Sequence, residues 1–168
     1  MTVTLIAARS ADGFLSQDGR IPWRLPDDVA QFRNYCRGQW LLVGRRTWEQ
    51  MQGWFQPDHK PVVITRSAGL EVARGHSAPS VEAGLALARS AMAAECVVIG
   101  GGQIYAAALP LAHVLLLTTV ETSLHHGDAS FPDFPPGDWR EVHSTHHPAD
   151  ARHPFAFTLQ RLERRNPL

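Results

Sequence analysis

The sequence has little cysteine, no excess charge and no long apolar run, and each absence excludes a class of protein. Only 2 cysteines occur among 168 residues, which excludes a disulfide-rich secreted domain. Cys36 and Cys96 each lie in an apolar segment, so we expect buried free thiols in a reducing compartment. The 16 basic and 16 acidic residues balance, which argues against a general nucleic-acid or membrane surface. No apolar run reaches the ~18 residues that a transmembrane helix needs.

Signals for targeting and for repeated architecture are missing as well. Residues 1–8 contain no charged leader before their apolar run, and no secretory cleavage pattern follows. No internal repeat, low-complexity tract or interdomain linker interrupts the chain. We therefore expect a single cytoplasmic domain over residues 1–168, long enough to bury a sizeable core.

Short apolar strands alternate with helical segments along the chain. This alternation predicts an α/β domain with a largely parallel sheet, to which two C-terminal strands add an antiparallel edge. The expected strands are residues 2–8, 40–44, 61–66, 71–78, 96–99, 113–120, 139–147 and 154–162. The expected helices are residues 26–38, 45–49, 81–92 and 104–109, and residues 9–24 and 124–137 are expected to be loops.

The first expected helix carries two adjacent carboxylates. At 3.6 residues per turn, Val29, Phe32 and Cys36 share one side of this helix; Asp28 lies at the edge of that side and Asp27 nearly opposite. A carboxylate in an apolar wall is costly unless it has a partner. Asp28 therefore either pairs locally at the helix N-terminus, where negative charge is favoured, or binds a ligand with paired N–H donors.

Glycines and cations follow three of the expected strands. Ligands in α/β sheets bind at the carboxyl ends of strands, and Arg45, Arg46 and Arg66 lie at such ends. Together they could hold the three phosphate groups of NADP, although each alone could equally be a solvated arginine. The glycines of residues 100–102 permit close approach of a backbone to a phosphate, but tight packing of a helix on the sheet explains them equally well.

Taken together, these segments resemble dihydrofolate reductase over nearly the whole chain. The resemblance is carried by Leu5-Ile6-Ala7-Ala8, Ile21-Pro22-Trp23, Leu25-Pro26-Asp27-Asp28, Gly44-Arg45-Arg46-Thr47-Trp48-Glu49, Val98-Ile99-Gly100-Gly101-Gly102, Leu117-Thr118, Gly127-Asp128 and Phe131-Pro132. It implies a mixed, mostly parallel eight-stranded sheet with flanking helices. It also implies NADPH-dependent reduction of 7,8-dihydrofolate to tetrahydrofolate, by hydride transfer to C6 and protonation of N5.

The resemblance also implies roles for particular residues. Asp28 would hydrogen-bond the pterin, Thr118 would support Asp28, and Trp23 would hold an ordered water; these three are the expected catalytic residues. The expected substrate-binding residues are Ile6, Ala7, Ala8, Leu25, Asp28, Phe32, Met51, Phe55, His59, Lys60, Ile99 and Thr118. The expected cofactor-binding residues are Ala8, Leu15, Ser16, Ile21, Gly44, Arg45, Arg46, Thr47, Thr65, Arg66, Ser67, Ile99, Gly101, Gly102, Gln103, Ile104 and Tyr105. Residues 9–24 would form a lid that excludes water.

Two positions depart from the family pattern. Ser16 stands in the lid where the family usually has glycine. His59 stands where the family has an arginine that clamps the glutamate α-carboxylate of folate. A histidine is partly neutral at pH 7 and lacks the bidentate fork of arginine, and Lys60 could substitute only as a point charge. Either folate binds more weakly than in the family, or the substrate is a pterin without that carboxylate.

Three hypotheses follow from these residues. The first is an NADPH-dependent dihydrofolate reductase, and the second is a reductase of another dihydropterin that lacks the glutamate carboxylate. The third is a non-catalytic nucleotide-binding protein. We expect a monomer that binds small molecules, with no nucleic-acid or membrane partner. We expect no metal site, because the histidines of the pairs His125-His126 and His146-His147 would point to opposite faces of a strand.

Overall fold

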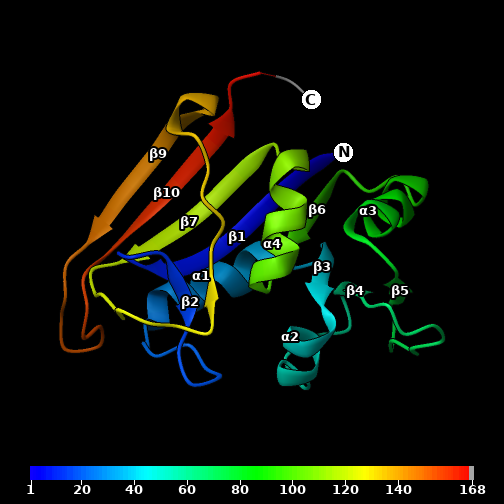
Figure 1. The fold of residues 1–168 in the computed structure, drawn as a ribbon, viewed down its shortest axis with the longest axis horizontal. Coiled ribbons are helices and arrows are strands. Elements are labelled where there is room, and N and C mark those ends of the chain that lie inside the picture. Colours follow the sequence, from blue (N-terminus) through cyan, green and yellow to red (C-terminus); the bar gives the residue numbers. More distant parts are fainter. Residues whose placement is uncertain (167–168) are drawn as a thin grey trace.

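A computed structural model describes residues 1–166, and its main element is an eight-stranded sheet with the strand order β5-β4-β3-β6-β1-β7-β10-β9 (Figure 1). The strands are β1 (Thr2–Ser10), β3 (Trp40–Gly44), β4 (Lys60–Ile64), β5 (His76–Ala78), β6 (Glu95–Val98), β7 (Val114–Val120), β9 (Trp139–His147) and β10 (Phe157–Arg164). Neighbouring strands from β5 to β7 are parallel, whereas β10 is antiparallel to both β7 and β9. The predicted fold class and its antiparallel C-terminal edge are confirmed.

Helices cover both faces of this sheet. They are α1 (Pro26–Cys36), α2 (Arg45–Gln50), α3 (Val81–Ser90) and α4 (Gly102–Ala108), with short 3-10 turns η1 (Leu109–Leu111) and η2 (Pro136–Asp138). In Figure 1, α4 lies in front of the sheet and α1 behind it. Within the described residues, no helix has both the length and the apolar character needed to cross a membrane.

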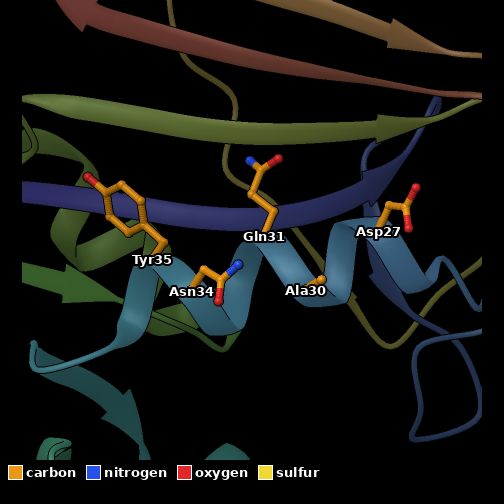
Figure 2. Close-up of a pocket in the computed structure, with 5 residues that line it drawn as sticks. All are labelled: Asp27, Ala30, Gln31, Asn34 and Tyr35. Atoms are coloured by element: carbon orange, nitrogen blue, oxygen red, sulfur yellow. The ribbon is translucent and has the colours of Figure 1, made fainter.

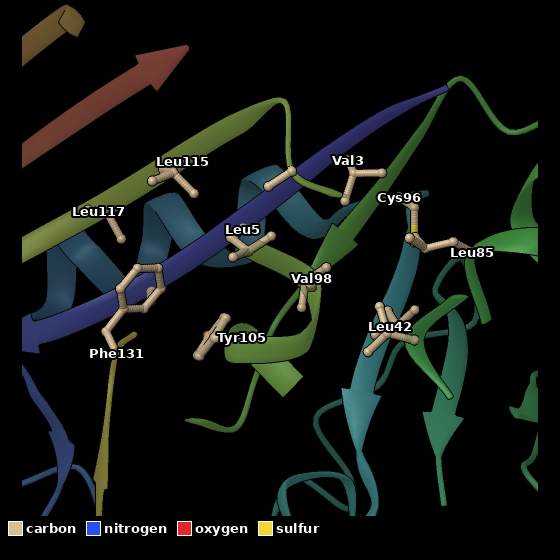
Figure 3. Packing of buried hydrophobic residues seen from close by; sticks show 14 of the residues in the cluster. Val3, Leu5, Leu42, Leu85, Cys96, Val98, Tyr105, Leu115, Leu117 and Phe131 are labelled. Carbon is tan, nitrogen blue, oxygen red and sulfur yellow. The ribbon is translucent and has the colours of Figure 1, made fainter. Parts of the chain in front are cut away.

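The central strands bury side chains on both faces because successive residues alternate. In β1, Val3 and Leu5 belong to one buried cluster, together with Leu85 of α3 and Tyr105 of α4 (Figure 3). Ile6 belongs to a second cluster on the other face, together with residues of α1 and α2. A continuous apolar run in each strand is the signature of such two-sided burial.

The register between β1 and β7 sets the position of the candidate site. Ile6 pairs with Leu116 and Ala8 pairs with Thr118, so Thr118 points to the same face as Ile6. That face is the one covered by α1. A polar side chain of the central sheet is thereby directed at the helix that carries Asp28.

Several boundaries and side-chain positions differ from the sequence prediction. A two-stranded sheet of β2 (Phe14–Ser16) and β8 (Ala129–Ser130) forms within the two regions expected to be loops. The expected helix over residues 81–92 is shorter, because α3 ends at Ser90 and Met92 has a φ of 55°; the Met92 side chain is 89% exposed. Val29 is 43% exposed, because Asp28 takes the inward position one residue earlier.

Candidate active site

Asp28 and Thr118 form a hydrogen-bonded pair between α1 and β7. The Thr118 Oγ1 hydroxyl donates to Asp28 Oδ1 at 2.5 Å, and Thr118 is buried. Burial raises the pKa of the Asp28 carboxyl, and the hydrogen bond from Thr118 partly opposes that rise. The inward direction predicted for Asp28 is confirmed. Asp27 points away from this site and contacts Arg152 instead.

Apolar residues cluster on the face of the sheet to which Thr118 points. Five of the predicted substrate-binding residues, Ile6, Phe32, Met51, Phe55 and Ile99, pack in a single cluster. Trp23 and Leu25 are buried in an adjoining cluster, against which Ala8 packs. The side chain of Ala7 packs instead with α3 and α4 on the opposite face, so Ala7 can reach a ligand on the Asp28 side only through its backbone.

The wall also contains an aromatic residue that the sequence prediction omitted. The Trp54 ring lies 5.2 Å from the Phe32 ring and 4.8 Å from the His59 ring. The signal available in the sequence was the run of aromatic residues at positions 54–55, shortly before His59 and directly after Gly53. Trp54 therefore links the α1 side of the pocket to the segment that contains His59.

His59 does not have the environment of a charged clamp. Its side chain is buried, and Nδ1 accepts a hydrogen bond from the Gln56 backbone N–H at 3.0 Å. Burial lowers the pKa of His59, and the Asp58 carboxylate opposes this only in part. The imidazole is therefore neutral near pH 7, with its proton on Nε2. A neutral imidazole provides no cation for the glutamate carboxylate of folate.

Lys60 is not placed to bind the glutamate carboxylate of folate either. It pairs with Trp40 in the register between β3 and β4, and Trp40 packs against the cluster on the α3 and α4 face. The Lys60 side chain therefore leaves the sheet on the face opposite Asp28. Neither residue provides a cation beside the predicted substrate pocket.

The predicted phosphate-binding residues come together at the carboxyl ends of β3, β4 and β6. The Gly44 N–H donates to Gly100 O at 2.7 Å, and the Gly100–Gly101 peptide bond is cis. A Cβ on Gly101 would lie 3.1 Å from Thr47 Oγ1, and one on Gly44 would lie 2.9 Å from Ile104 Cγ1. These close approaches explain why glycine is needed at both positions.

Cations and hydroxyls line the same edge of the sheet. Arg45 bonds Ser67 Oγ at 2.9 Å and Glu49 at 2.7 Å, and the Ser67 N–H donates to Thr65 Oγ1 at 3.1 Å. Arg46 and Arg66 are exposed. The set can present positive charge and hydroxyl donors to the phosphates of an elongated anion.

The predicted lid contacts this edge through β2 and β8. The Gly19 N–H donates to Asp128 Oδ2 at 2.6 Å, and the Asp128 N–H donates to Ser16 O at 3.0 Å. A Cβ on Gly102 would lie 3.0 Å from Ser130 O, so β8 lies against the start of α4. The other predicted lid and helix residues are Leu15, Ile21, Gln103 and Tyr105; Ile21 is exposed, whereas buried Tyr105 donates its hydroxyl to Ile6 O at 2.7 Å.

A separate hollow lies along α1 and does not include Asp28. It is lined by Asp27, Ala30, Gln31, Asn34 and Tyr35 (Figure 2). At one end, the Tyr35 hydroxyl donates to Glu95 Oε1 at 2.7 Å. None of its lining residues was predicted to bind substrate or cofactor. This hollow is therefore separate from the site that contains Asp28.

Comparisons with known proteins agree with this geometry. A family model described as dihydrofolate reductase matches residues 2–164. Dihydrofolate reductase type 3 from Salmonella typhimurium is 37% identical over 98% of this chain and 99% of its own. The Neisseria meningitidis serogroup B enzyme is 39% identical over 86% of this chain and 88% of its own. A solved structure of Enterococcus faecalis dihydrofolate reductase, complexed with NADP(H) and RAB-propyl, is similar to this chain with a TM-score of 0.86. The two sequences are 24% identical, and the match covers 98% of this chain and 97% of that chain. At this identity the similarity shows the fold alone.

The raised pKa of Asp28 predicts a specific dependence of stability on pH. The folded state holds the Asp28 proton to higher pH than the unfolded chain does, so the contribution of Asp28 to stability decreases as pH rises above about 4. Asp28→Asn should therefore raise Tm at pH 7 by about 2 °C or more, and this gain should shrink below pH 4. Thermal melts at pH 7 and below pH 4 measure this difference in Tm. The exposed control Asp18→Asn should leave Tm unchanged; a lower Tm for Asp28→Asn at pH 7 would contradict the assignment.

Proposed function

The chain belongs to the dihydrofolate reductase family, and on that premise we propose that Asp28 binds the pterin ring while Thr118 holds the carboxylate in place. The enzyme reduces 7,8-dihydrofolate to 5,6,7,8-tetrahydrofolate; a hydride goes to C6 and a proton to N5. When bound, NADPH supplies the hydride. Ile6, Ile99 and Thr118 lie on the α1 side of the sheet, and Gly44 lies at the carboxyl end of β3.

The observation that supports this proposal most strongly is the Asp28–Thr118 pair. Thr118 uses its only hydroxyl proton on Oδ1, and within residues 1–166 no hydrogen bond is made by Asp28 Oδ2. That oxygen, in a wall of apolar side chains, is suited to the paired N–H donors of a pterin edge. A neutral ligand without such donors would leave the carboxylate partly buried and unmatched.

Asp28 acts on the ring from a distance. A carboxylate bonded to the amide edge of the pterin cannot also reach N5, so water is the immediate proton donor. Asp28 raises the proton affinity of the ring and fixes its orientation. Buried Trp23, whose predicted role is to hold the donor water, lies in the same region. Closure of β2 against β8 keeps bulk water away from the reacting atoms.

The residues at the carboxyl edge fit NADPH. The lack of a side chain at Gly44 and Gly101 lets Ile104 and Thr47 pack closely against them, and we expect the backbone exposed beside them to approach the pyrophosphate. Arg45, Arg46 and Arg66 would bind the phosphates, assisted by the hydroxyls of Thr47, Thr65 and Ser67. Ile99, which is buried in the same cluster as Ile6, would lie where the nicotinamide and pterin rings meet.

A second candidate substrate is favoured by the positions of His59 and Lys60. His59 is buried and neutral, and Lys60 leaves the sheet on the other face. A dihydropterin without the glutamate tail has no carboxylate that needs a cation, so its binding is not weakened by that arrangement. We therefore propose that the enzyme accepts truncated dihydropterins in addition to dihydrofolate.

The single domain, the monomeric state and the cytoplasmic location expected from the sequence are part of the same proposal. Their support is that the family match spans residues 2–164, that the predicted site draws all its residues from one chain, and that Cys36 and Cys96 are free buried thiols.

Asp28→Asn tests the central assignment. The amide cannot accept from both pterin donors and carries no charge, so the rate of hydride transfer at pH 7 should fall about 10²-fold. The adjacent control Asp27→Asn should change the rate less than threefold, because that side chain faces the opposite way. Single-turnover kinetics at saturating NADPH measure both rates. Equal losses in the two variants would overturn the assignment.

The arginines at the carboxyl edge predict a preference for NADPH over NADH. Each charge-assisted hydrogen bond to the extra phosphate contributes roughly 1.5–3 kcal/mol before solvent screening, so kcat/KM should favour NADPH by at least about tenfold. Arg45→Ala and Arg66→Ala should each reduce that ratio. Arg140→Ala, at the opposite edge of the sheet, is the matched control and should leave it intact. Comparable kcat/KM for both cofactors in the unmodified enzyme would refute the assignment.

The environment of His59 and Lys60 predicts weak discrimination between long and short substrates. Lys60→Gln should leave KM for dihydrofolate within twofold, and KM should show no inflection from His59 between about pH 7 and 8, because burial lowers the pKa of His59. Truncated dihydropterin should have a kcat/KM within about tenfold of that for dihydrofolate. Lys60→Arg controls for effects of the substitution itself. A rise in KM of fivefold or more for Lys60→Gln alone would show that Lys60 does meet the carboxylate.

A further inference from the structure

Three potential metal ligands meet where the connection between β9 and β10 crosses the first turn of α1. They are Asp27, His147 and His153, whose ligand atoms all lie within 4.8 Å of one another. Asp27 Oδ2 is 3.4 Å from His147 Nε2 and 3.6 Å from His153 Nε2. In a tetrahedral zinc site the ligand atoms are about 3.3–3.4 Å apart, so these two separations need little adjustment.

The sequence gives no sign of this cluster, because His147 and His153 are not adjacent and Asp27 lies far from both along the chain. The side chains of His146 and His147 point in different directions, as expected. His146 lies 3.0 Å from Glu121, whereas His147 faces Asp27. The second imidazole comes from His153, which returns to the same place after the turn between the strands. Only the fold brings these residues together.

Hydrogen bonds on the far side of each ring determine which nitrogen faces the cluster. His153 Nδ1 lies 2.8 Å from Asp150 Oδ1, and His147 Nδ1 lies 2.7 Å from Pro148 O. Both partners are acceptors, since one is a carboxylate oxygen and the other is a backbone carbonyl oxygen. Each Nδ1 therefore carries the hydrogen, and each Nε2 directs a lone pair toward Asp27. Metal-binding histidines are held in this way, by a carboxylate or carbonyl on the second ring nitrogen.

The surroundings hold the cluster in place and leave it open to an ion. His153 is fully buried, and the His147 ring stacks on Phe157 with centroids 4.7 Å apart. Arg152 contacts Oδ1 of Asp27 at 3.2 Å, so Oδ2 faces the imidazoles. His153 Nε2 also accepts from the Asp27 N–H at a long 3.2 Å. Two imidazole lone pairs and a carboxylate oxygen repel one another unless a positive charge lies between them.

We propose that Asp27, His147 and His153 bind a divalent transition-metal ion of the zinc type, with a fourth coordination position open to solvent. Two imidazoles and a carboxylate suit such ions and do not suit Mg²⁺ or Ca²⁺. Asp150 Oδ2, at 3.8 Å from His147 Nε2, is the nearest further oxygen. The ion would join the β9–β10 connection to α1, one residue before Asp28, and it is independent of the dihydrofolate reaction.

The test uses the full chain, free of any affinity tag and treated with a chelator. Calorimetric titration with Zn²⁺ should show one ion per chain, and Co²⁺ should give the intense visible absorption of a four-coordinate site. His147→Ala and Asp27→Asn should each weaken binding at least about tenfold. His146→Ala, the adjacent histidine that faces Glu121, should bind as the unmodified chain does.

Thermal melts with and without Zn²⁺ separate loss of the site from loss of the fold. Zn²⁺ should raise Tm for the unmodified chain and for His146→Ala, but not for His147→Ala. His153 is not substituted, because it also accepts from the first turn of α1. Absence of Zn²⁺ binding by the unmodified chain, binding that survives His147→Ala, or equal loss in His146→Ala would each overturn the proposal.

Discussion

The hydrogen bond between Asp28 and Thr118 is the interaction on which the arrangement of the site depends. A carboxylate on the inward side of α1 is stable only if the sheet supplies a donor beneath it. Thr118 supplies that donor without adding charge, so Asp28 keeps both its raised pKa and a free oxygen for a ligand. The cost to stability and the proposed capacity to bind a pterin both come from the same partly buried carboxylate.

The alternation of side-chain directions along β1 and β7 makes the contact between Thr118 and Asp28 possible. Ala8 and Thr118 are paired across β1 and β7 and share the face of Ile6, so residues two apart along each strand collect under α1. The carboxyl ends of β3, β4 and β6 meet at one edge of the sheet, where Gly44 approaches Gly100. The residues predicted to bind substrate and those predicted to bind cofactor are thus brought together by two independent properties of a parallel sheet.

Much of this could be predicted from the sequence, for identifiable reasons. Continuous apolar runs marked the central strands, and Pro26 marked the start of α1, so the inward direction of Asp28 was predictable from helical spacing. β2 and β8 were missed because strands of three and two residues carry too little pattern. The environment of His59 was not predictable, because its neutral form depends on burial and on a backbone N–H from Gln56. The convergence of His147 and His153 likewise depends on how one turn folds.

The central claim is that Asp28 is a partly buried carboxylate with a raised pKa, restrained by Thr118. Its most direct test is a pH titration of the free protein, labelled with ¹³C at the aspartate side-chain carboxyl carbons and followed by NMR, with the Asp28 resonance assigned from Asp28→Asn. We expect a pKa above the ordinary aspartate value of 3.8 for Asp28, and a still higher pKa in Thr118→Val, which removes the opposing hydrogen bond. A pKa at or below the ordinary value, or one that falls in Thr118→Val, would contradict the account.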